Sequence, residues 1–120
     1  MYGPTVLEHF RRPRNQQRLD APSASHESYN PLCGDRVRLE VAVEAGIVVR
    51  AGFTANACAV CTASASLLTE RVARIPLAEA MALDDAVMIA ALGTELPPAR
   101  VACATLPLRA LHGALASCRE

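Results

Sequence analysis

The chain has 120 residues, with twelve arginines, no lysine and twelve acidic residues, so its formal net charge is +0. This length fits one domain with a real core, and we expect residues 1–120 to form a single domain. A balanced charge gives no reason to expect a nucleic acid or a membrane surface as a partner.

The N-terminal segment, Met1–Arg12, lacks the continuous apolar stretch of a signal peptide. No part of the chain reaches the about 18 consecutive apolar residues that a membrane span needs. We therefore expect a cytoplasmic protein. Thiols stay reduced in the cytoplasm, so the five cysteines indicate metal or redox chemistry rather than a disulfide framework.

The first expected element is a short amphipathic helix over residues 4–12. Val6, Leu7 and Phe10 recur at helical spacing there, and Pro13 follows. The next segment, residues 15–29, is polar and predicts a loop that leads into an edge strand.

A hairpin is expected in the middle of the chain. Residues 36–44 alternate charged and apolar side chains, which predicts a strand with one buried face. Ala45 and Gly46 form a tight turn into a second strand over residues 47–55. Asp35 precedes the first strand and Cys58 follows the second, so the two residues should lie at the same end of the sheet.

The second half of the chain is expected to be helical. Small residues after Cys58 predict a closely packed helix that ends near Arg74. Residues 77–92 predict one or two helices, with Asp84 as an N-cap. The two prolines in residues 96–100 predict an extended connector.

The last expected helix carries Leu108, Leu111 and Leu115 on one face. Pro107 lies in its first turn or kinks it. Cys103 should then lie just before this helix.

Three cysteines and one aspartate are candidate ligands of a single metal: Cys33, Asp35, Cys58 and Cys103. Three thiolates and a carboxylate suit zinc, iron or an iron–sulfur cluster far better than magnesium or calcium. The carboxylate is the ligand most easily displaced from such a sulfur-rich centre, so the site is suited to opening.

A rival interpretation uses Cys58 and Cys61 as a Cys-x-x-Cys dithiol for disulfide exchange. The antiparallel hairpin speaks against it, because a thioredoxin-type protein needs a parallel βαβ setting. Cys61 also lies one helical turn from Cys58, which places it beside the candidate metal site. Cys118 receives no role, and other polar side chains are better explained by packing or exposure: His9, His26, His112, Ser64 and Ser66.

In order, the motifs resemble the scaffold family of iron–sulfur cluster assembly, which includes IscU, SufU and the N-terminal domain of NifU. The resemblance covers nearly the whole chain and rests on four segments: Glu8–Asn15, Cys33–Asp35, Cys58 with Ala63–Glu70, and Leu96–Cys103. It implies an α+β fold of the SufE/NifU type, with a small three-stranded antiparallel sheet and helices packed on one face.

The resemblance also implies a function and the residues that perform it. The family's ligands fall on Cys33, Asp35, Cys58 and Cys103, with Cys33 or Cys103 as the sulfur acceptor. A cysteine desulfurase would supply the sulfur, and a labile [2Fe–2S] cluster would be built and passed to acceptor apo-proteins. Such a scaffold is not an enzyme, and zinc would be an alternative occupant of its ligands.

Three features depart from the family pattern. Ala102 replaces the histidine that precedes the last ligand in IscU-type proteins, which favours the alternative of a SufU-like, zinc-dependent sulfur-transfer protein. Ala99 and Arg100 replace Val-Lys in the Leu96–Arg100 element, through which IscU-type scaffolds meet an Hsp70-type chaperone. Cys61 stands where family members usually have a small residue without a thiol.

Overall fold

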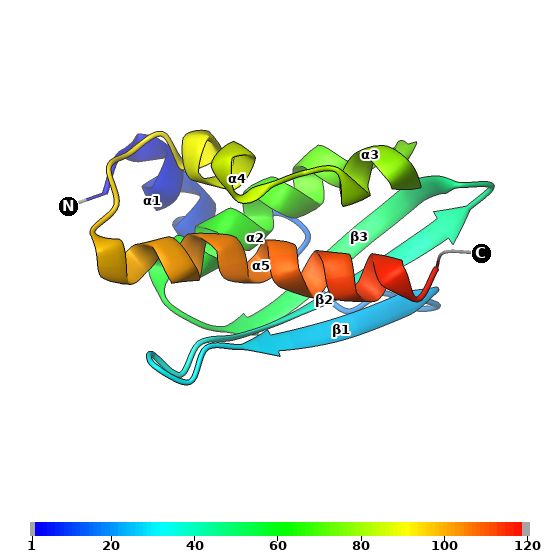
Figure 1. Ribbon diagram of the computed structural model, residues 1–120, viewed down its shortest axis with the longest axis horizontal. Helices are drawn as coiled ribbons and strands as arrows, with labels where there is room; N and C mark the ends of the chain where they lie inside the picture. The colour runs from blue at the N-terminus through cyan, green and yellow to red at the C-terminus, as the bar shows by residue number, and fades with distance from the viewer. Residues whose placement is uncertain (1, 119–120) are drawn as a thin grey trace.

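The structure is a computed structural model that describes residues 2–118. It is an α+β arrangement in which an antiparallel sheet carries a layer of helices (Figure 1). The elements follow the order α1 (Pro4–Arg11), β1 (Ala24–Tyr29), β2 (Arg36–Glu44), β3 (Ile47–Asn56), α2 (Ala59–Val72), β4 (Ile75–Pro76), α3 (Leu77–Met81), α4 (Asp85–Leu92) and α5 (Pro98–Ala116). Within this described part of the chain, every helix is too short or too polar to cross a lipid bilayer.

The sheet has four strands in the order β1-β2-β3-β4, one more than predicted. The expected hairpin is present as β2 and β3, and the expected edge strand is β1. The added strand, β4, has two residues that pair with Ile47 and Val48. A strand of that length is too short to display a period-two pattern in the sequence.

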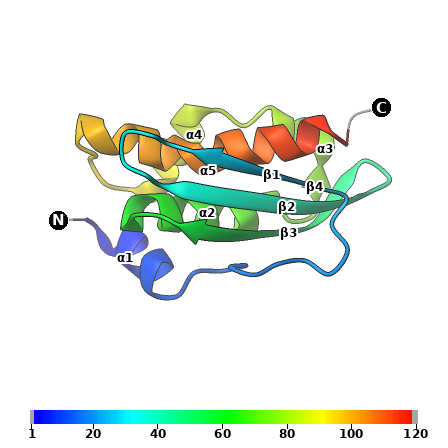
Figure 2. The ribbon, with the colours of Figure 1, turned by 90° about the horizontal axis from the view of Figure 1, so that it is seen from below.

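Helices α2 and α5 pack on one face of the sheet, as predicted (Figures 1 and 2). The alternation in β2 directs Val37, Leu39 and Val41 into the interface with the helices, and all three are fully buried. Helix α2 also contacts α1 and α4, so it is enclosed on several sides. This enclosure explains its many buried alanine, serine and threonine residues, because small side chains let neighbouring elements approach closely.

Helix α5 begins earlier than predicted. The prediction of an extended connector over residues 96–100 is therefore wrong for its second half, which is helical. Pro98 occupies the first position of the helix, where the missing N–H costs nothing. Cys103 therefore lies in the second turn of α5 and not before it. Pro107 lies in the interior of the helix, and its lack of an N–H removes the helical partner of the Cys103 carbonyl.

The face of the sheet that α2 and α5 leave free is partly covered by the segment between α1 and β1. Glu40 of β2 anchors this segment: its carboxylate is 1% exposed and accepts hydrogen bonds from Arg18 Nε at 2.7 Å and Leu19 N at 2.8 Å. A Cβ on Gly52 would lie 2.6 Å from the Gln17 carbonyl oxygen. Glycine at this position allows the close approach of the two backbones.

Glu40→Gln is expected to lower the free energy of unfolding by about 1–3 kcal/mol at pH 7, because charged hydrogen bonds to a buried group are lost. Burial alone would raise the pKa of Glu40, but the Leu19 N–H and the guanidinium groups of Arg38 and Arg18 hold it below its ordinary value. The carboxylate therefore stabilises the fold above its unfolded-state pKa of about 4.3, and that contribution is lost as pH falls through the lower folded-state pKa.

Urea unfolding between pH 7 and pH 3 measures this effect. The wild type should lose more stability on acidification than Glu40→Gln, and Glu27→Gln at an exposed position of β1 should behave like the wild type. Parallel pH profiles for the wild type and Glu40→Gln would contradict the assignment.

Candidate metal centre

The first candidate ligand lies on the loop between β1 and β2. Asn30 organises this loop: its side-chain oxygen accepts the Leu32 N–H at 3.0 Å and its carbonyl accepts the Gly34 N–H at 2.7 Å. Gly34 has φ +79°, a left-handed conformation that a side chain would strain. The turn leaves Cys33 exposed and directs Asp35 into the protein.

Asp35 is 6% exposed and has two unequal carboxylate oxygens. Its Oδ1 accepts the backbone N–H of Cys58 at 3.3 Å, which ties the start of β2 to the start of α2. Its Oδ2 is buried and has no hydrogen-bond partner among the described residues. A buried carboxylate oxygen without a donor is costly, and a cation bound to it would remove that cost.

Cys103 approaches the same place from α5. Its side chain is fully buried, and its Sγ lies 3.9 Å from Cys33 Sγ. Burial raises the pKa of Cys103 to about 12, with a further contribution from the neighbouring Cys58 thiol. One sulfur or oxygen atom from each of Cys33, Asp35 and Cys103 lies within 4.8 Å of the others, which is a separation that one metal ion can bridge.

Cys58, the fourth candidate, lies outside this 4.8 Å group. It is the N-cap of α2 and is partly buried. Its backbone N–H holds Asp35, and its thiol is close enough to act on the pKa of Cys103. The structure therefore brings three of the four candidate ligands together and leaves the Cys58 thiol outside that group.

Arg100 is a neighbour of the centre that the sequence analysis considered only for chaperone recognition. Its Nη1 lies 4.0 Å from Cys103 Sγ, one helical turn away. Residues three apart in a helix are neighbours, so the spacing of Arg100 and Cys103 predicts this contact only if both lie in one helix. The prediction of an extended segment over residues 96–100 hides this signal. A guanidinium at this distance favours the thiolate form of Cys103.

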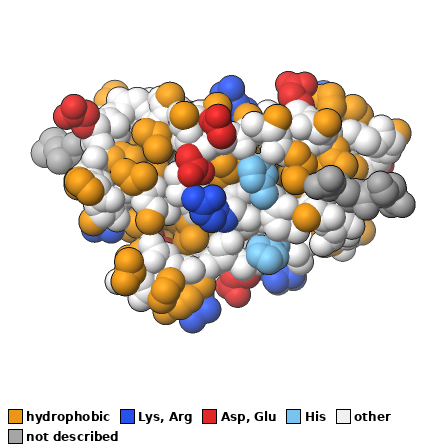
Figure 3. All heavy atoms as spheres, viewed as in Figure 1, with side chains coloured by type: hydrophobic (Ala, Val, Ile, Leu, Met, Phe, Trp, Pro, Cys, Tyr) orange, Lys and Arg blue, Asp and Glu red, His pale blue; other side chains and the backbone are white. Residues whose placement is uncertain are grey.

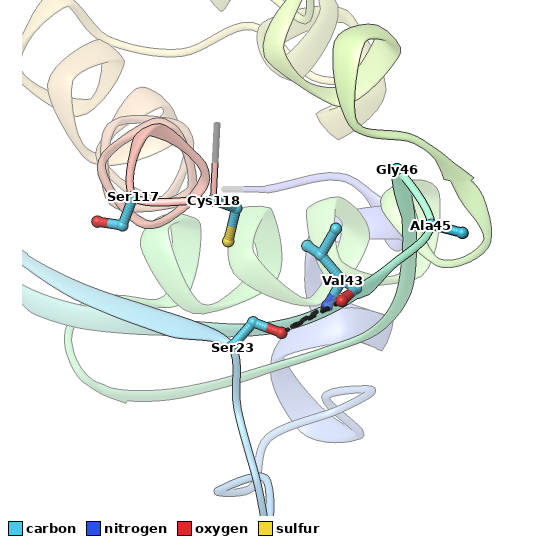
Figure 4. Close-up of a pocket in the computed structure, with 6 residues that line it drawn as sticks. All are labelled: Ser23, Val43, Ala45, Gly46, Ser117 and Cys118. Carbon is cyan, nitrogen blue, oxygen red and sulfur yellow. Dashed lines mark hydrogen bonds between the residues drawn. The ribbon is translucent and has the colours of Figure 1, made fainter. Parts of the chain in front are cut away.

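The two remaining cysteines have different environments. Cys61 is fully buried in the first turn of α2. Cys118 follows α5 and lines a pocket with Ser23 and Val43, next to the β2–β3 turn (Figure 4). Because α5 spans 19 residues between these regions, Cys118 lies far from Cys103 and takes no part in the centre.

Three of the other polar candidates, His9, Ser64 and Ser66, have structural partners, whereas the buried Nε2 of His112 has no hydrogen-bond partner among residues 2–118. His9 Nδ1 lies 2.7 Å from Ser66 Oγ, which joins α1 to α2. Ser66 Oγ also accepts the Arg14 N–H at 2.9 Å. Ser64 Oγ donates to the Ala104 carbonyl at 2.6 Å and so ties α2 to α5 beside Cys103.

Exposed apolar side chains lie on and beside the β1–β2 loop that carries Cys33. Tyr29 is 48% exposed and Leu32, next to Cys33, is 95% exposed. Hydrophobic side chains gather at the end of the molecule where the β1–β2 loop lies (Figure 3). The residues Pro31, Val101 and Ala102 help to line a groove there. The exposed thiol of Cys33 is thus presented on a surface suited to protein contacts.

The family model described as the NifU-like N terminal domain matches residues 1–120. The chain belongs to the NifU N-terminal family. Among the relatives of this NifU-type chain are the zinc-dependent sulfurtransferase SufU of Bacillus subtilis, 30% identical over 97% of this chain and 90% of the relative, and the iron–sulfur cluster assembly scaffold protein IscU of Escherichia coli, 34% identical over 96% and 91%.

A third relative is longer than this NifU-type chain. The bifunctional protein NifU/MnmA of Rubrobacter xylanophilus is 38% identical over 94% of this chain, but the match covers only 23% of that protein. Among solved structures, a putative iron–sulfur cluster assembly scaffold protein for the SUF system from Fervidobacterium islandicum matches with a TM-score of 0.79. That match covers 95% of this chain and 96% of the other at 22% identity, and it shows that the two share a fold.

Proposed function

We propose that this NifU-type chain, as one domain over residues 1–120, is a cytoplasmic scaffold for iron–sulfur cluster assembly. It accepts sulfur from a cysteine desulfurase, builds a labile [2Fe–2S] cluster on Cys33, Asp35, Cys58 and Cys103, and passes the cluster to acceptor apo-proteins. The single observation that carries the proposal is that Oδ2 of buried Asp35, beside the thiols of Cys33 and Cys103, has no hydrogen-bond partner within residues 2–118. Relatives that are named iron–sulfur cluster assembly scaffold proteins support it.

The donor set is suited to a cluster that the scaffold must release. Thiolates hold iron strongly, whereas the hard carboxylate of Asp35 is the weaker partner for a sulfur-rich centre. Arg100 contributes positive charge next to Cys103. The residues also fit zinc, which takes tetrahedral sulfur and oxygen ligands and keeps coordinated thiols deprotonated.

Cys33 is the proposed sulfur acceptor, because it is the exposed member of the set, whereas Cys103 is fully buried. The Cys33 thiolate attacks the outer sulfur of the desulfurase persulfide. The sulfur–sulfur bond of that persulfide breaks, the desulfurase cysteine leaves as a thiolate, and Cys33 becomes the persulfide. Tyr29 and Leu32 provide apolar surface for the docking that this step needs.

The second candidate function is a SufU-like sulfurtransferase in which the same four residues hold a permanent zinc ion. Ala102 favours it, since IscU-type proteins carry histidine there, and one relative is named a zinc-dependent sulfurtransferase.

The dithiol redox alternative is the weakest of the three. Cys61 is fully buried, and burial raises its pKa, so it is a poor partner for disulfide exchange.

A Hsp70-type chaperone remains a proposed partner through Leu96–Arg100. Pro97 is the N-cap of α5 and Pro98 its first residue, so the second half of this segment is helical. A chaperone that binds an extended peptide would have to unwind the first turn of α5. Unwinding would also move Arg100 away from Cys103, which would couple chaperone binding to the centre.

Anaerobic reconstitution with iron and sulfide tests the scaffold proposal. We expect visible charge-transfer absorption from the wild type and its loss in Cys58→Ser, with Cys118→Ser as the matched thiol control. A protein that stays colourless and instead holds one zinc ion per chain would refute cluster assembly and favour the sulfurtransferase.

A further inference from the structure

Cys61 is a buried thiol next to the candidate centre, and the proposed function gives it no role. It lies three residues after Cys58 in the first turn of α2, so the two side chains project from the same face of the helix. Its side chain is fully buried. A further buried sulfur donor is therefore present in the first turn of the helix that Cys58 caps.

The charge and thiols that act on Cys61 belong to the set of candidate ligands. Burial raises the pKa of Cys61, and the charge of Asp35 and the thiols of Cys58, Cys103 and Cys33 raise it further. Among them, Asp35 acts most strongly. The Cys61 Sγ nevertheless lies outside the group of donor atoms within 4.8 Å of one another, as the Cys58 Sγ does.

An independent observation points to a cation in the same part of the interior. Asp35 is 6% exposed, and its buried Oδ2 has no hydrogen-bond partner among residues 2–118. A metal ion bound to this oxygen would lie at the start of α2, because Oδ1 of the same carboxylate accepts the Cys58 N–H and Cys61 is in the first turn of that helix. Zinc and iron favour thiolate over carboxylate, so such an ion has two competing partners there.

We propose that Cys61 is a reserve ligand that competes with Asp35 for one position on the metal. The inference rests on the proposed function, because it concerns the same centre. In the exchange, the metal–oxygen bond to Asp35 breaks, a metal–sulfur bond to Cys61 forms, and the thiol proton passes to the released carboxylate. The four-thiolate state holds the metal, and the state with Asp35 is ready to release it.

The plain alternative is that Cys61 only fills space in α2, whose other buried residues are mostly small. If Cys61 only fills space, its replacement should change the stability of the fold and leave metal binding unchanged. The experiment therefore has to read the metal itself.

Anaerobic titration with cobalt(II) of the wild type, Asp35→Ala, Cys61→Ala and Asp35→Ala/Cys61→Ala provides this readout. Sulfur-to-cobalt charge-transfer absorption increases with the number of bound thiolates. We expect the band of Asp35→Ala to exceed that of Asp35→Ala/Cys61→Ala by about one third, as four thiolates become three. Competition for zinc should show the double variant binding at least about ten-fold more weakly than Asp35→Ala. Its loss of affinity should exceed the sum of the losses in the two single variants.

Two controls separate ligand loss from damage to the fold. Cys118→Ser in the Asp35→Ala background removes a distant thiol and should leave the band unchanged. Asp35→Ala/Cys61→Ser, with a side chain of nearly the same size, should repeat the result of the alanine variant, and thermal unfolding identifies variants that are not folded.

Equal bands and equal zinc affinities for Asp35→Ala and Asp35→Ala/Cys61→Ala, in proteins that fold, would overturn the role of Cys61. This failure is distinct from that of the proposed function. A wild type that binds neither cobalt nor zinc would overturn both, whereas normal metal binding by the wild type with no effect of Cys61 would overturn only the reserve ligand.

Discussion

Cys33→Ser is expected to abolish the transfer of sulfur from a cysteine desulfurase, while Cys103→Ser retains transfer. The reason is access: Cys33 is exposed on the β1–β2 loop, and Cys103 is fully buried in α5. With its pKa raised to about 12, the Cys103 thiol is also protonated near neutral pH unless a metal binds it. Radioactive sulfur from labelled cysteine, followed by separation of the proteins without reductant, measures the transfer.

Two comparisons make this test specific. Cys118→Ser removes a partly buried thiol far from the centre and should accept sulfur like the wild type. Leu32→Ser should weaken acceptance by impairing docking, and a higher concentration of the scaffold should restore it. Label on Cys33→Ser together with none on Cys103→Ser would assign the acceptor to the buried cysteine instead.

Asp35→Ala is expected to slow the transfer of a cluster to an acceptor apo-protein by about ten-fold or more, a barrier change of ~1.4 kcal/mol, without abolishing assembly. The carboxylate is the ligand that soft metals hold least firmly, so its removal takes away the easiest path of exchange. Stopped-flow absorption of the acceptor's cluster measures the rate, and the absorption of the loaded scaffold measures the assembly.

Asp35→Asn is the matched variant for this prediction. It retains an oxygen that accepts the Cys58 N–H and removes the negative charge. If transfer depends on the carboxylate as a ligand, Asp35→Asn should resemble Asp35→Ala. Transfer from Asp35→Ala at the wild-type rate would refute the role of this residue in release.

Local patterns were sufficient to predict the part of the site that follows from chain geometry. Residues 36–44 alternate, Ala45 and Gly46 turn, and the resulting register places Arg36 opposite Asn56. Asp35 and Cys58 therefore meet at one end of the sheet, where the Cys58 N–H donates to Asp35 Oδ1. Local hydrogen-bonding rules determine this juxtaposition, which is why it could be predicted from the sequence.

One of the missed features follows a local rule for proline, and the others depend on tertiary structure. Pro98 was treated as a helix breaker, although the first position of a helix accepts proline, so α5 was expected to start too late and Arg100 was not placed beside Cys103. Strand β4 forms only because β3 offers it an edge. The distance between the thiols of Cys33 and Cys103, which are 70 residues apart, depends on how α5 packs across the sheet.

The hydrogen bond between Asp35 and the start of α2 determines what happens when the centre empties. It fixes the carboxylate without using Oδ2, so a departing metal breaks no contact on which the backbone depends. Classical zinc fingers unfold when they lose their ion, whereas here three donors are held together by the sheet, a turn and a helix. Refilling then starts from three donors that are already in place. Such a preorganised cradle is suited to repeated cycles of loading and unloading.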